Sequence, residues 1–325
     1  MSQESQFLAA LRSLATHPAA RGLADDAAVL EVGGTSLVIT HDMLVEGVHF
    51  LPCDPPGDVA WKLLAVNLSD LAAKGARPVG VLMGYSLRGE PEWDAAFVAG
   101  LGPALAAFDV PLLGGDTVGV PAEAPRMLGL TALGRADGPV PSRSGARPGD
   151  DLWVSGTVGD AGAGLRVLLG EIHGADALVE RYRRPHPRLE AGQRLAPLVG
   201  AMMDVSDGLL IDAARMAEAS GAAVRVDLAQ VPLSEPLGAL GGDEAARLAA
   251  ATAGDDYELL FAAPPAQAEA LFALSAELGL PFTRIGSFAK GAGIALLHGG
   301  ISIPLPERLG WEHGLSPVES GGGRP

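Results

Sequence analysis

Short apolar runs and longer apolar stretches with helical spacing follow one another along the whole chain. In the first half, the short runs predict strands at 27–30, 36–40, 79–85, 110–113 and 127–133. The longer stretches predict helices at 1–20, 56–74 and 92–108. This mixture indicates an α+β protein.

The second half repeats the mixture after a turn at 136–139, which is the clearest candidate for a domain boundary. Strands are predicted at 151–154, 224–228, 259–261, around Ile285 and at 294–297. Helices are predicted after the glycine-rich turn 156–164 and from 204–210 onward. We therefore expect two α/β-mixed domains, 1–137 and 138–314, and a disordered tail at 315–325.

One predicted helix carries a polar stripe within an otherwise apolar sequence. Two prolines precede this helix, and Gly75 is placed to end it in a left-handed conformation. Asn67, Asp70 and Lys74 are spaced i, i+3 and i+7, so they share one face. Taken alone, such a stripe is more often the solvent side of a helix than the floor of a site.

A similar acidic segment in the second half changes this interpretation. Asp204 and Asp207 also open or belong to an Ala-rich helix. Acid-bearing helices in both halves favour two related α+β domains that face one cleft.

Composition limits the classes of partner. The net charge of −16, from 39 acidic and 23 basic residues, argues against nucleic acid and against an anionic membrane. It permits anionic small molecules if divalent cations invert the local field. A single cysteine, Cys53, excludes an internal disulfide and a cysteine-based zinc site. Because the sequence has neither a signal peptide nor an apolar run of about 18 residues, we expect a cytoplasmic protein.

Several acids stand beside glycine or at the end of a predicted strand: Asp26, Asp42, Asp70, Asp116, Asp204, Asp207 and Asp255. Clustered carboxylates repel one another unless cations bind them, and oxygen ligands suit Mg²⁺. Several bound cations would in turn indicate a polyphosphate ligand. Neither a P-loop motif nor protein-kinase motifs are present. Phosphates would therefore depend on Mg²⁺, glycine-turn N–H groups, a helix N-terminus near Ser206 and an arginine such as Arg143.

Seven segments match one family in order and spacing: GLADDAAVL, ITHDMLVEGVHF, VNLSDLAAKGARP, LLGGDT, SRSGARPGD, DVSDGL and GDDYELL. The chain resembles the thiamine-monophosphate kinase family, which is related to aminoimidazole ribonucleotide synthetase. The resemblance implies ATP-dependent phosphorylation of thiamine phosphate to thiamine diphosphate, by direct in-line transfer assisted by several Mg²⁺ ions. It also implies a homodimer in which the N-terminal sheets form a barrel, with the C-terminal α+β domain over the nucleotide.

The resemblance assigns roles to individual residues. The implied metal ligands are Asp26, Thr40, His41, Asp42, Asp70, Asp116, Asp204 and Asp207, with His41 contributing at most its backbone. The implied ATP contacts are Gly115, Asp116, Arg143 and Ser206, and the implied thiamine phosphate contacts are His49, Asp255 and Trp311. Asn67 would orient Asp70 or a phosphate.

Three positions depart from the family pattern. Ala24 stands where a glycine is usual, so that turn must form without a positive φ. His41 replaces a threonine, and Asp255 replaces a glutamate that would reach one methylene farther.

Simpler explanations exist for several assigned residues. Asp25 is interpreted as a solvated or capping neighbour of Asp26, and Lys74 is expected at the surface. Ser206 is also a candidate helix N-cap, and Trp311 a candidate packing anchor.

Two other functions stay open from the residues. The first is another ATP-dependent reaction of the superfamily, such as an amidine-forming ring closure. Selenophosphate synthesis is disfavoured because the glycine-rich N-terminal loop lacks cysteine. The second is a nucleotide-binding or metal-binding scaffold without catalysis.

Overall fold

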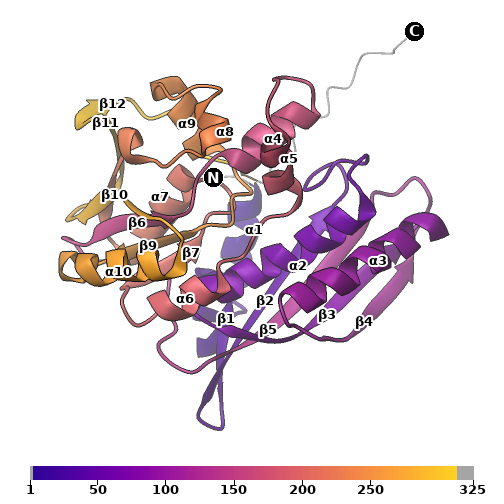
Figure 1. Ribbon diagram of the computed structural model, residues 1–325. Helices are drawn as coiled ribbons and strands as arrows, with labels where there is room; N and C mark the ends of the chain where they lie inside the picture. Colours follow the sequence, from indigo (N-terminus) through magenta and orange to yellow (C-terminus); the bar gives the residue numbers. More distant parts are fainter. Residues whose placement is uncertain (1–2, 313–325) are drawn as a thin grey trace.

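The computed structural model describes residues 3–312, which form two mixed, open β-sheets with helices packed on them (Figure 1). The first half contains α1 (Gln3–Arg12), η1 (Pro18–Leu23), β1 (Ala28–Val32), β2 (Thr35–Val45), α2 (Pro56–Ala73), β3 (Arg77–Leu87), α3 (Pro91–Ala107), β4 (Leu112–Gly119) and β5 (Met127–Ala136). Its strands are ordered β1-β2-β5-β3-β4, with β3 and β4 parallel and the other pairs antiparallel.

The second half forms a sheet of seven strands. Its elements are β6 (Asp151–Ser155), α4 (Asp160–Leu168), α5 (Asp176–Arg183), α6 (Leu189–Leu195), β7 (Ala201–Asp204), α7 (Leu209–Ser220), β8 (Ala223–Asp227), η2 (Leu228–Gln230), α8 (Glu235–Gly238), α9 (Glu244–Thr252), β9 (Leu259–Ala263), η3 (Pro265–Gln267), α10 (Ala268–Leu278), β10 (Phe282–Ala289), β11 (Gly293–His298) and β12 (Ile301–Ile303). The strand order is β12-β11-β8-β10-β6-β9-β7. The two-domain α+β architecture expected from the sequence is confirmed.

Two predicted elements differ from the structure. The strand predicted at 110–113 continues through the GGDT segment, because β4 pairs with β3 as far as Gly119. The helix predicted at 1–20 ends at Arg12, and the apolar side chains of Phe7 and Leu14 in that range are exposed. The expected domain boundary at 137–138 falls between β5 and β6, and the tail at 315–325 lies outside the described residues.

Helix α2 lies between the two halves (Figure 1). It contacts β2 and β5 on one side, and α6 and β7 of the second half on the other. Its residues from Val59 to Ala73 are buried, apart from the half-buried Trp61. Gly75 follows with φ +61°, and a Cβ there would lie 2.6 Å from the Cβ of Ala196. Glycine is therefore needed both for the backbone conformation and for the close approach of α6.

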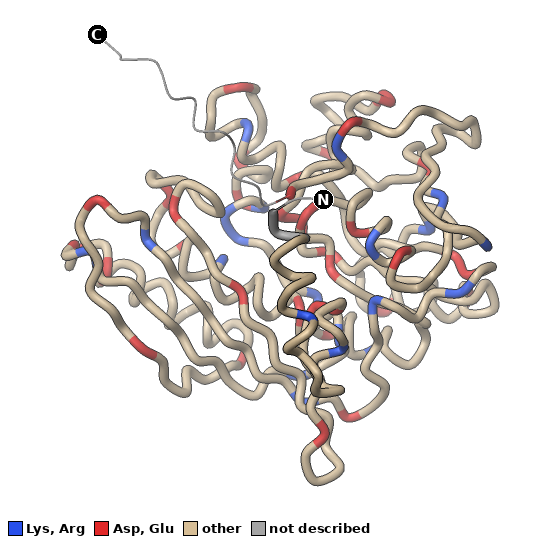
Figure 2. Tube along the Cα trace, turned by 180° about the vertical axis from the view of Figure 1, so that it is seen from behind, with Lys and Arg blue, Asp and Glu red and all other residues tan. Residues whose placement is uncertain are grey.

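Helix α3 covers the same face of the N-terminal sheet beside α2 (Figure 1). The opposite face is turned toward the viewer in Figure 2. On that face Leu113 is 56% exposed and Val118 is 59% exposed, and Met43 and Leu82 are exposed as well. A broad part of the N-terminal sheet therefore presents apolar side chains to solvent.

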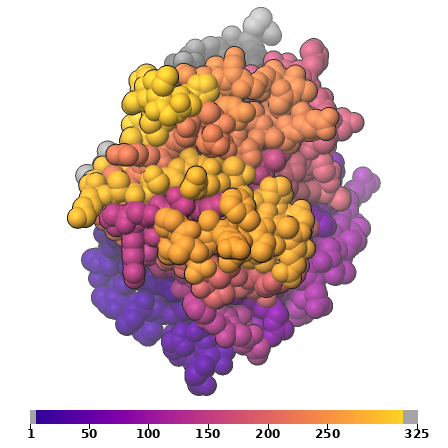
Figure 3. Space-filling model, turned by 60° about the vertical axis from the view of Figure 1, so that its left-hand side comes forward, coloured from indigo at the N-terminus to yellow at the C-terminus, as the bar shows by residue number. Residues whose placement is uncertain are grey.

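The two halves lie directly against each other (Figure 3). Tyr257, from the segment before β9, packs in the core of the N-terminal half with residues such as Leu44 and Phe50. No helix among residues 3–312 has the length and apolarity needed to cross a membrane.

Candidate active site

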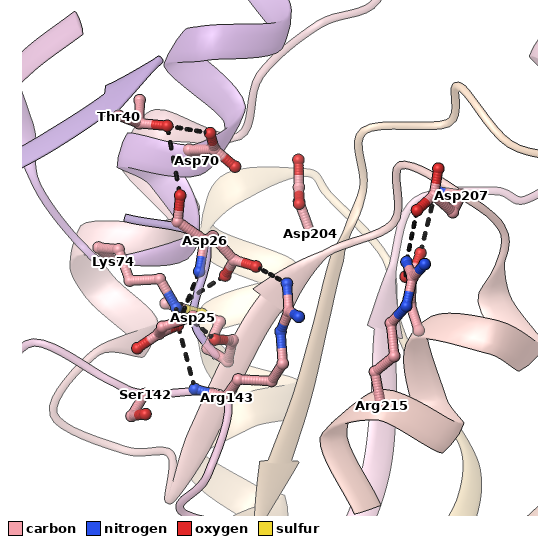
Figure 4. Close-up of polar contacts among 12 residues, drawn as sticks. Asp25, Asp26, Thr40, Asp70, Lys74, Ser142, Arg143, Asp204, Asp207 and Arg215 are labelled. Carbon is pink, nitrogen blue, oxygen red and sulfur yellow. Dashed lines mark hydrogen bonds and ion pairs between the residues drawn. The ribbon is translucent and has the colours of Figure 1, made fainter. Parts of the chain in front are cut away.

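Three carboxylates meet beside α2, and they are called the carboxylate cluster below (Figure 4). Asp26 precedes β1, Asp70 is in α2 and Asp204 ends β7, and one oxygen of each lies within 4.8 Å of the others. The cluster therefore joins the two halves of the chain. These are three of the acids that the sequence predicted as metal ligands.

Neighbouring hydroxyls hold two members of the cluster. Thr40 Oγ1 donates to Asp70 Oδ2, and it lies 3.3 Å from the backbone oxygen of Asp26. Ser69 Oγ donates to Asp204 Oδ2 at 2.6 Å. Because Ser69 and Asp70 are adjacent in α2, this helix fixes both carboxylates.

Two cations hold the third member (Figure 4). Lys74 Nζ lies 2.7 Å from Asp26 Oδ2, and Arg143 Nη2 donates to Asp26 Oδ1. Burial alone would raise the pKa of Asp26, but Lys74 and Arg143 outweigh it and lower the pKa to about 2. Asp26 is therefore ionised near neutral pH.

Lys74 and Asp25 correct two expectations from the sequence. The side chain of Lys74 is 0% exposed instead of lying at the surface, and its Nζ also donates to the carbonyl oxygen of Met202 at 3.1 Å. Asp25 is buried rather than solvated: it pairs with Lys74 and accepts from Arg21 Nη1 at 2.6 Å. The reason is that β7 covers this end of α2, and a buried ammonium requires negative partners.

The electrostatics of the cluster favour a bound cation. Burial, followed by the charges of Asp42, Asp204 and Asp26, raises the pKa of Asp70 well above its usual value. Burial and the charge of Asp26 likewise raise the pKa of Asp204. Asp26 Oδ2 is buried and receives no hydrogen bond of good geometry, even though Lys74 is close. An oxygen-rich, mutually repelling set with a spare buried acceptor fits Mg²⁺.

Asn67, the third polar residue of α2, orients a strand. Its Oδ1 accepts from the backbone N of Asp42 at 2.8 Å, and its Nδ2 donates to the Leu63 carbonyl at 2.9 Å. Asn67 therefore positions Asp42, rather than Asp70 as expected from the sequence. All three residues of the polar stripe are buried, so its interpretation as a solvent face is wrong.

Asp207 lies apart from the cluster and pairs with an arginine (Figure 4). Arg215 Nη1 contacts Asp207 Oδ2 and lies 3.0 Å from Asp212 Oδ1. The carboxylate of Asp212 accepts from the backbone N of Asp207 and of Gly208, at 3.1 and 3.2 Å. Gly208 is the N-cap of α7, so Ser206 does not cap this helix.

A cavity of about 880 Å³ opens between the two halves. Its lining includes the predicted contact residues Asp42, His49, Ser206, Asp207, Asp255 and Trp311. Sequence reasoning did not single out the two tyrosines among the other lining residues, Tyr182 and Tyr257. Tyr257 stands two positions after Asp255, whereas no local pattern marks Tyr182.

The segment beside this cavity has an unusual backbone. Asp255 has φ +69° and Tyr257 has φ +51°, which is the left-handed region that side chains rarely adopt. At Ala24 the backbone has φ −121°, so this residue needs no positive φ. In that turn the positive values fall on Arg21, Gly22 and Leu23 instead.

Three further predicted residues, Gly115, Asp116 and His41, lie away from the cluster. Strand pairing aligns Asp42 with Leu130, Met83 and Gly115 in turn, so Gly115 and Asp116 lie three strands, about 14 Å, from Asp42. A Cβ at Gly115 would lie 1.9 Å from the Met83 carbonyl oxygen. The close approach of β3 therefore requires glycine at this position.

The ring of His41 points away from the cluster as well. It lies on the exposed face of the sheet, where its Nδ1 is 2.9 Å from Thr131 Oγ1.

Comparisons with known proteins agree with this geometry. The chain matches the family AIR synthase related protein, N-terminal domain, over residues 24–136, and the C-terminal domain of the same family over residues 147–299. It is 43% identical to thiamine-monophosphate kinase of Caulobacter vibrioides over 306 residues, which cover 91% of this chain and 86% of the relative. It is 39% identical to the thiamine-monophosphate kinase of Escherichia coli K12, over 91% of this chain and 92% of the relative.

Solved structures give the same result. Thiamine-monophosphate kinase from Stenotrophomonas maltophilia K279a is 40% identical with a TM-score of 0.76, covering 92% of this chain and 96% of the other. A structure described as AaThiL complexed with AMPPCP and TMP is 30% identical with a TM-score of 0.83, covering 96% and 97%. With its carboxylate cluster, its interdomain cavity and these relatives, the chain belongs to the thiamine-monophosphate kinase family of enzymes.

Proposed function

We propose that this chain transfers the γ-phosphoryl group of ATP to the phosphate of thiamine phosphate, giving thiamine diphosphate and ADP. The observation that carries the proposal is the buried carboxylate cluster beside a cavity lined by both halves. The complex of AaThiL with AMPPCP, an ATP analogue, and TMP supports the same pair of substrates for this relative.

The cluster fits several Mg²⁺ ions. Asp26, Asp70 and Asp204 would hold the metal, with Thr40 and Asp42 beside them. Asp207, which lines the cavity but lies apart from the cluster, and the backbone of His41 stay proposed ligands from the family pattern. When bound, Mg²⁺ supplies positive charge that offsets the phosphates and the charge developing on the transferring group.

The chain's own residues position the phosphates and need not remove a proton. The acceptor oxygen of thiamine phosphate is already ionised near neutral pH, so in-line transfer requires alignment rather than a general base. Arg143 is bound to Asp26 and is 21% exposed, so it is placed to exchange this partner for an ATP phosphate. Ser206, which lines the cavity, is a further proposed ATP contact. Gly115 is a proposed ATP contact from the family pattern, but like Asp116 it lies in β4, three strands from Asp42.

His49, Asp255 and Trp311 form the proposed contact for the thiamine portion, and this wall is called the thiamine end below. All three line the cavity. Trp311 lines the cavity and is 55% exposed, so its indole is placed to stack on a thiamine ring. Its backbone N donates to the Asp207 carbonyl at 2.8 Å, which fixes it beside the phosphate side of the cavity.

The exposed apolar face of the N-terminal sheet supports a homodimer. We propose that two copies join through this face, which carries Leu82, Leu113 and Val118, and that the two sheets form one barrel. Leu113→Asp should convert the dimer to a monomer in light scattering, whereas Glu123→Lys, an exposed substitution outside this face, should leave it dimeric. A dimeric Leu113→Asp variant would contradict this assignment.

Asp116 gains a role in such a dimer. It lies on the same open face and too far from Asp42 for a shared metal within one chain. We therefore propose that Asp116 serves the site of the second copy. Mixing inactive Asp116→Asn and Asp70→Asn subunits should then restore part of the activity, since one of the two mixed sites keeps both residues. Mixtures that stay inactive would contradict it.

The assay that tests the proposed function supplies ATP, Mg²⁺ and thiamine phosphate and measures ADP and thiamine diphosphate. We expect equal amounts of both products, and none of either when Mg²⁺ is chelated. Parallel reactions with the amidine-forming ribonucleotide substrate should give no product. ATP binding without ADP formation in the presence of thiamine phosphate would reject the kinase and favour a scaffold.

A further inference from the structure

Lys62 is a buried cation behind the thiamine end, and the roles assigned above leave it unexplained. Its side chain is 2% exposed. Its Nζ donates to Asp255 Oδ2 at 2.8 Å and to the backbone oxygen of His49 at 3.0 Å. The same Nζ lies 4.0 Å from the ring centroid of Tyr182. One ammonium therefore ties together the segment after β2, helix α5 and the segment before β9.

The three partners of Lys62 all line the cavity, whereas Lys62 lies behind them. A group in this place acts on a ligand through its partners and not by touching it. Lys62, Val66 and Asp70 are spaced i, i+4 and i+8 in α2, and Val66 lines the cavity between them. Lys62 and Asp70 are about 12 Å apart along the axis, so one rigid helix reaches both ends of the site.

The orientation of the Asp255 carboxylate depends on its contact with Lys62. Its carboxylate receives Lys62 on Oδ2 and the hydroxyl of Tyr257 on Oδ1, at 3.1 Å. A carboxylate has about four acceptor positions, so two contacts leave capacity for a ligand donor. The side chain of Asp255 is 30% exposed, so this capacity faces the cavity.

The backbone alone does not fix this carboxylate. The positive φ values of Asp255 and Tyr257 place the segment in a conformation that persists only when its surroundings hold it. Backbone hydrogen bonds at 2.8 Å, from Asp255 to the Ser206 carbonyl and from Tyr257 to the Val205 carbonyl, hold the chain. The side-chain contact from Lys62 then selects the direction of the carboxylate.

We propose that Lys62 is a positioning residue that sets the affinity for thiamine phosphate, and not for ATP, by fixing Asp255 and the His49 segment. This inference rests on the proposed function. Its chemical content is that a buried ammonium holds a carboxylate as an oriented acceptor for N–H donors of the aminopyrimidine of thiamine phosphate.

The test compares Lys62→Met with the wild-type protein and with Lys290→Met, which removes an exposed lysine far from this cavity. Methionine keeps the length and apolar stem of lysine but loses the charge. We expect Lys62→Met to raise KM for thiamine phosphate at least tenfold, to leave KM for ATP within twofold, and to lower kcat less than KM rises. We expect Lys290→Met to match wild type in all three constants.

Asp255→Asn and the double variant Lys62→Met/Asp255→Asn complete a double-mutant cycle with Lys62→Met and the wild-type protein. If Lys62 acts through Asp255, the double variant should have nearly the KM for thiamine phosphate of Asp255→Asn alone. If Lys62→Met fails to fold because the Asp255 carboxylate has lost its cation partner, the double variant removes that charge and still permits the comparison with Asp255→Asn.

Three results would overturn the role of Lys62. The first is an unchanged KM for thiamine phosphate in Lys62→Met, and the second is an equal rise of KM for both substrates. The third is a KM for thiamine phosphate in the double variant that rises by the product of the two single-variant fold-changes. Wild-type turnover is measured first, so its absence rejects the proposed function itself. Normal wild-type turnover with any of these three results rejects only the role of Lys62.

Discussion

The carboxylate cluster and the thiamine end are served by the same helix, but they differ in burial and in what holds them in place. At the cluster, Asp70 and Asp204 are buried and Asp26 is held by two cations. At the thiamine end, Asp255 and Trp311 are partly exposed and the backbone is strained. The cluster is therefore organised by charge, and the thiamine end by shape and by one buried cation. Changes at the cluster should affect turnover and stability, whereas changes at the thiamine end should affect substrate affinity.

The largest expected effect is that of Asp70→Asn. The amide keeps the shape and the contact with Thr40, but it removes a charge from the centre of the cluster. We expect kcat to fall at least 10³-fold, about 4 kcal/mol of transition-state stabilisation, with an unchanged circular dichroism spectrum. Asp207→Asn should also lower turnover by orders of magnitude.

Asp137→Asn is the matched control, because Asp137 is exposed and pairs only with Arg135 among the contacts of the described residues. Near-wild-type formation of thiamine diphosphate by Asp70→Asn would remove Asp70 from the metal site.

The next effect concerns stability. Lys74→Met leaves Asp25 and Asp26 without their shared ammonium in a buried place. Removing one partner of a buried ion pair costs about 3 kcal/mol or more, so urea unfolding should show a loss of that size. Lys290→Met should change the free energy of unfolding by less than about 0.5 kcal/mol. A loss below about 1 kcal/mol for Lys74→Met would show that the ion pairs of Lys74 contribute little to the stability of the C-terminal end of α2.

A smaller effect is expected from Trp311→Ala. Losing the exposed indole face should raise KM for thiamine phosphate about tenfold, about 1.4 kcal/mol, and leave kcat within a few-fold. Trp311→Phe keeps an aromatic face and should recover most of the affinity. Equal constants for Trp311→Ala and wild type would make Trp311 a packing residue.

The smallest effect is a pH-dependent response to Mg²⁺. Burial is the main reason that the folded-state pKa values of Asp70 and Asp204 are raised above 3.8. Without metal, protonation of these two carboxyls therefore contributes its full stability below about pH 4. That stability is lost as the pH rises through the raised values. Since Mg²⁺ binds the ionised form, the rise in Tm on adding Mg²⁺ should be a few degrees larger at about pH 8 than at about pH 5, which lies closer to the ordinary carboxyl range.

Thermal unfolding in Mg²⁺ and in EDTA at both pH values measures this difference. The Asp70→Asn variant should show a reduced difference, because one of the repelling charges is gone. A Tm increment that is equal or smaller at the higher pH would argue against metal binding at these carboxylates.

Local sequence determined the bounds of most elements and the identity of the acids that meet. A proline at the first turn and Gly75 after the last one define α2, because both act on their own backbone. Asp26 and Asp204 belong to the acids that stand beside glycine or at a strand end, and this position marked them as candidate site residues. The family motifs then indicated which acids belong to one site.

Only the tertiary structure decided which polar side chains are buried and what they contact. Lys74 was expected at the surface because its helix face is polar, but β7 supplies the Met202 carbonyl that covers it. Lys62 showed no signal because its partner Asp255 is 193 positions away. Spacing along a helix tells which residues share a face, whereas the burial of that face depends on distant segments. The same helix therefore carries a site on the stripe that the sequence alone would assign to solvent.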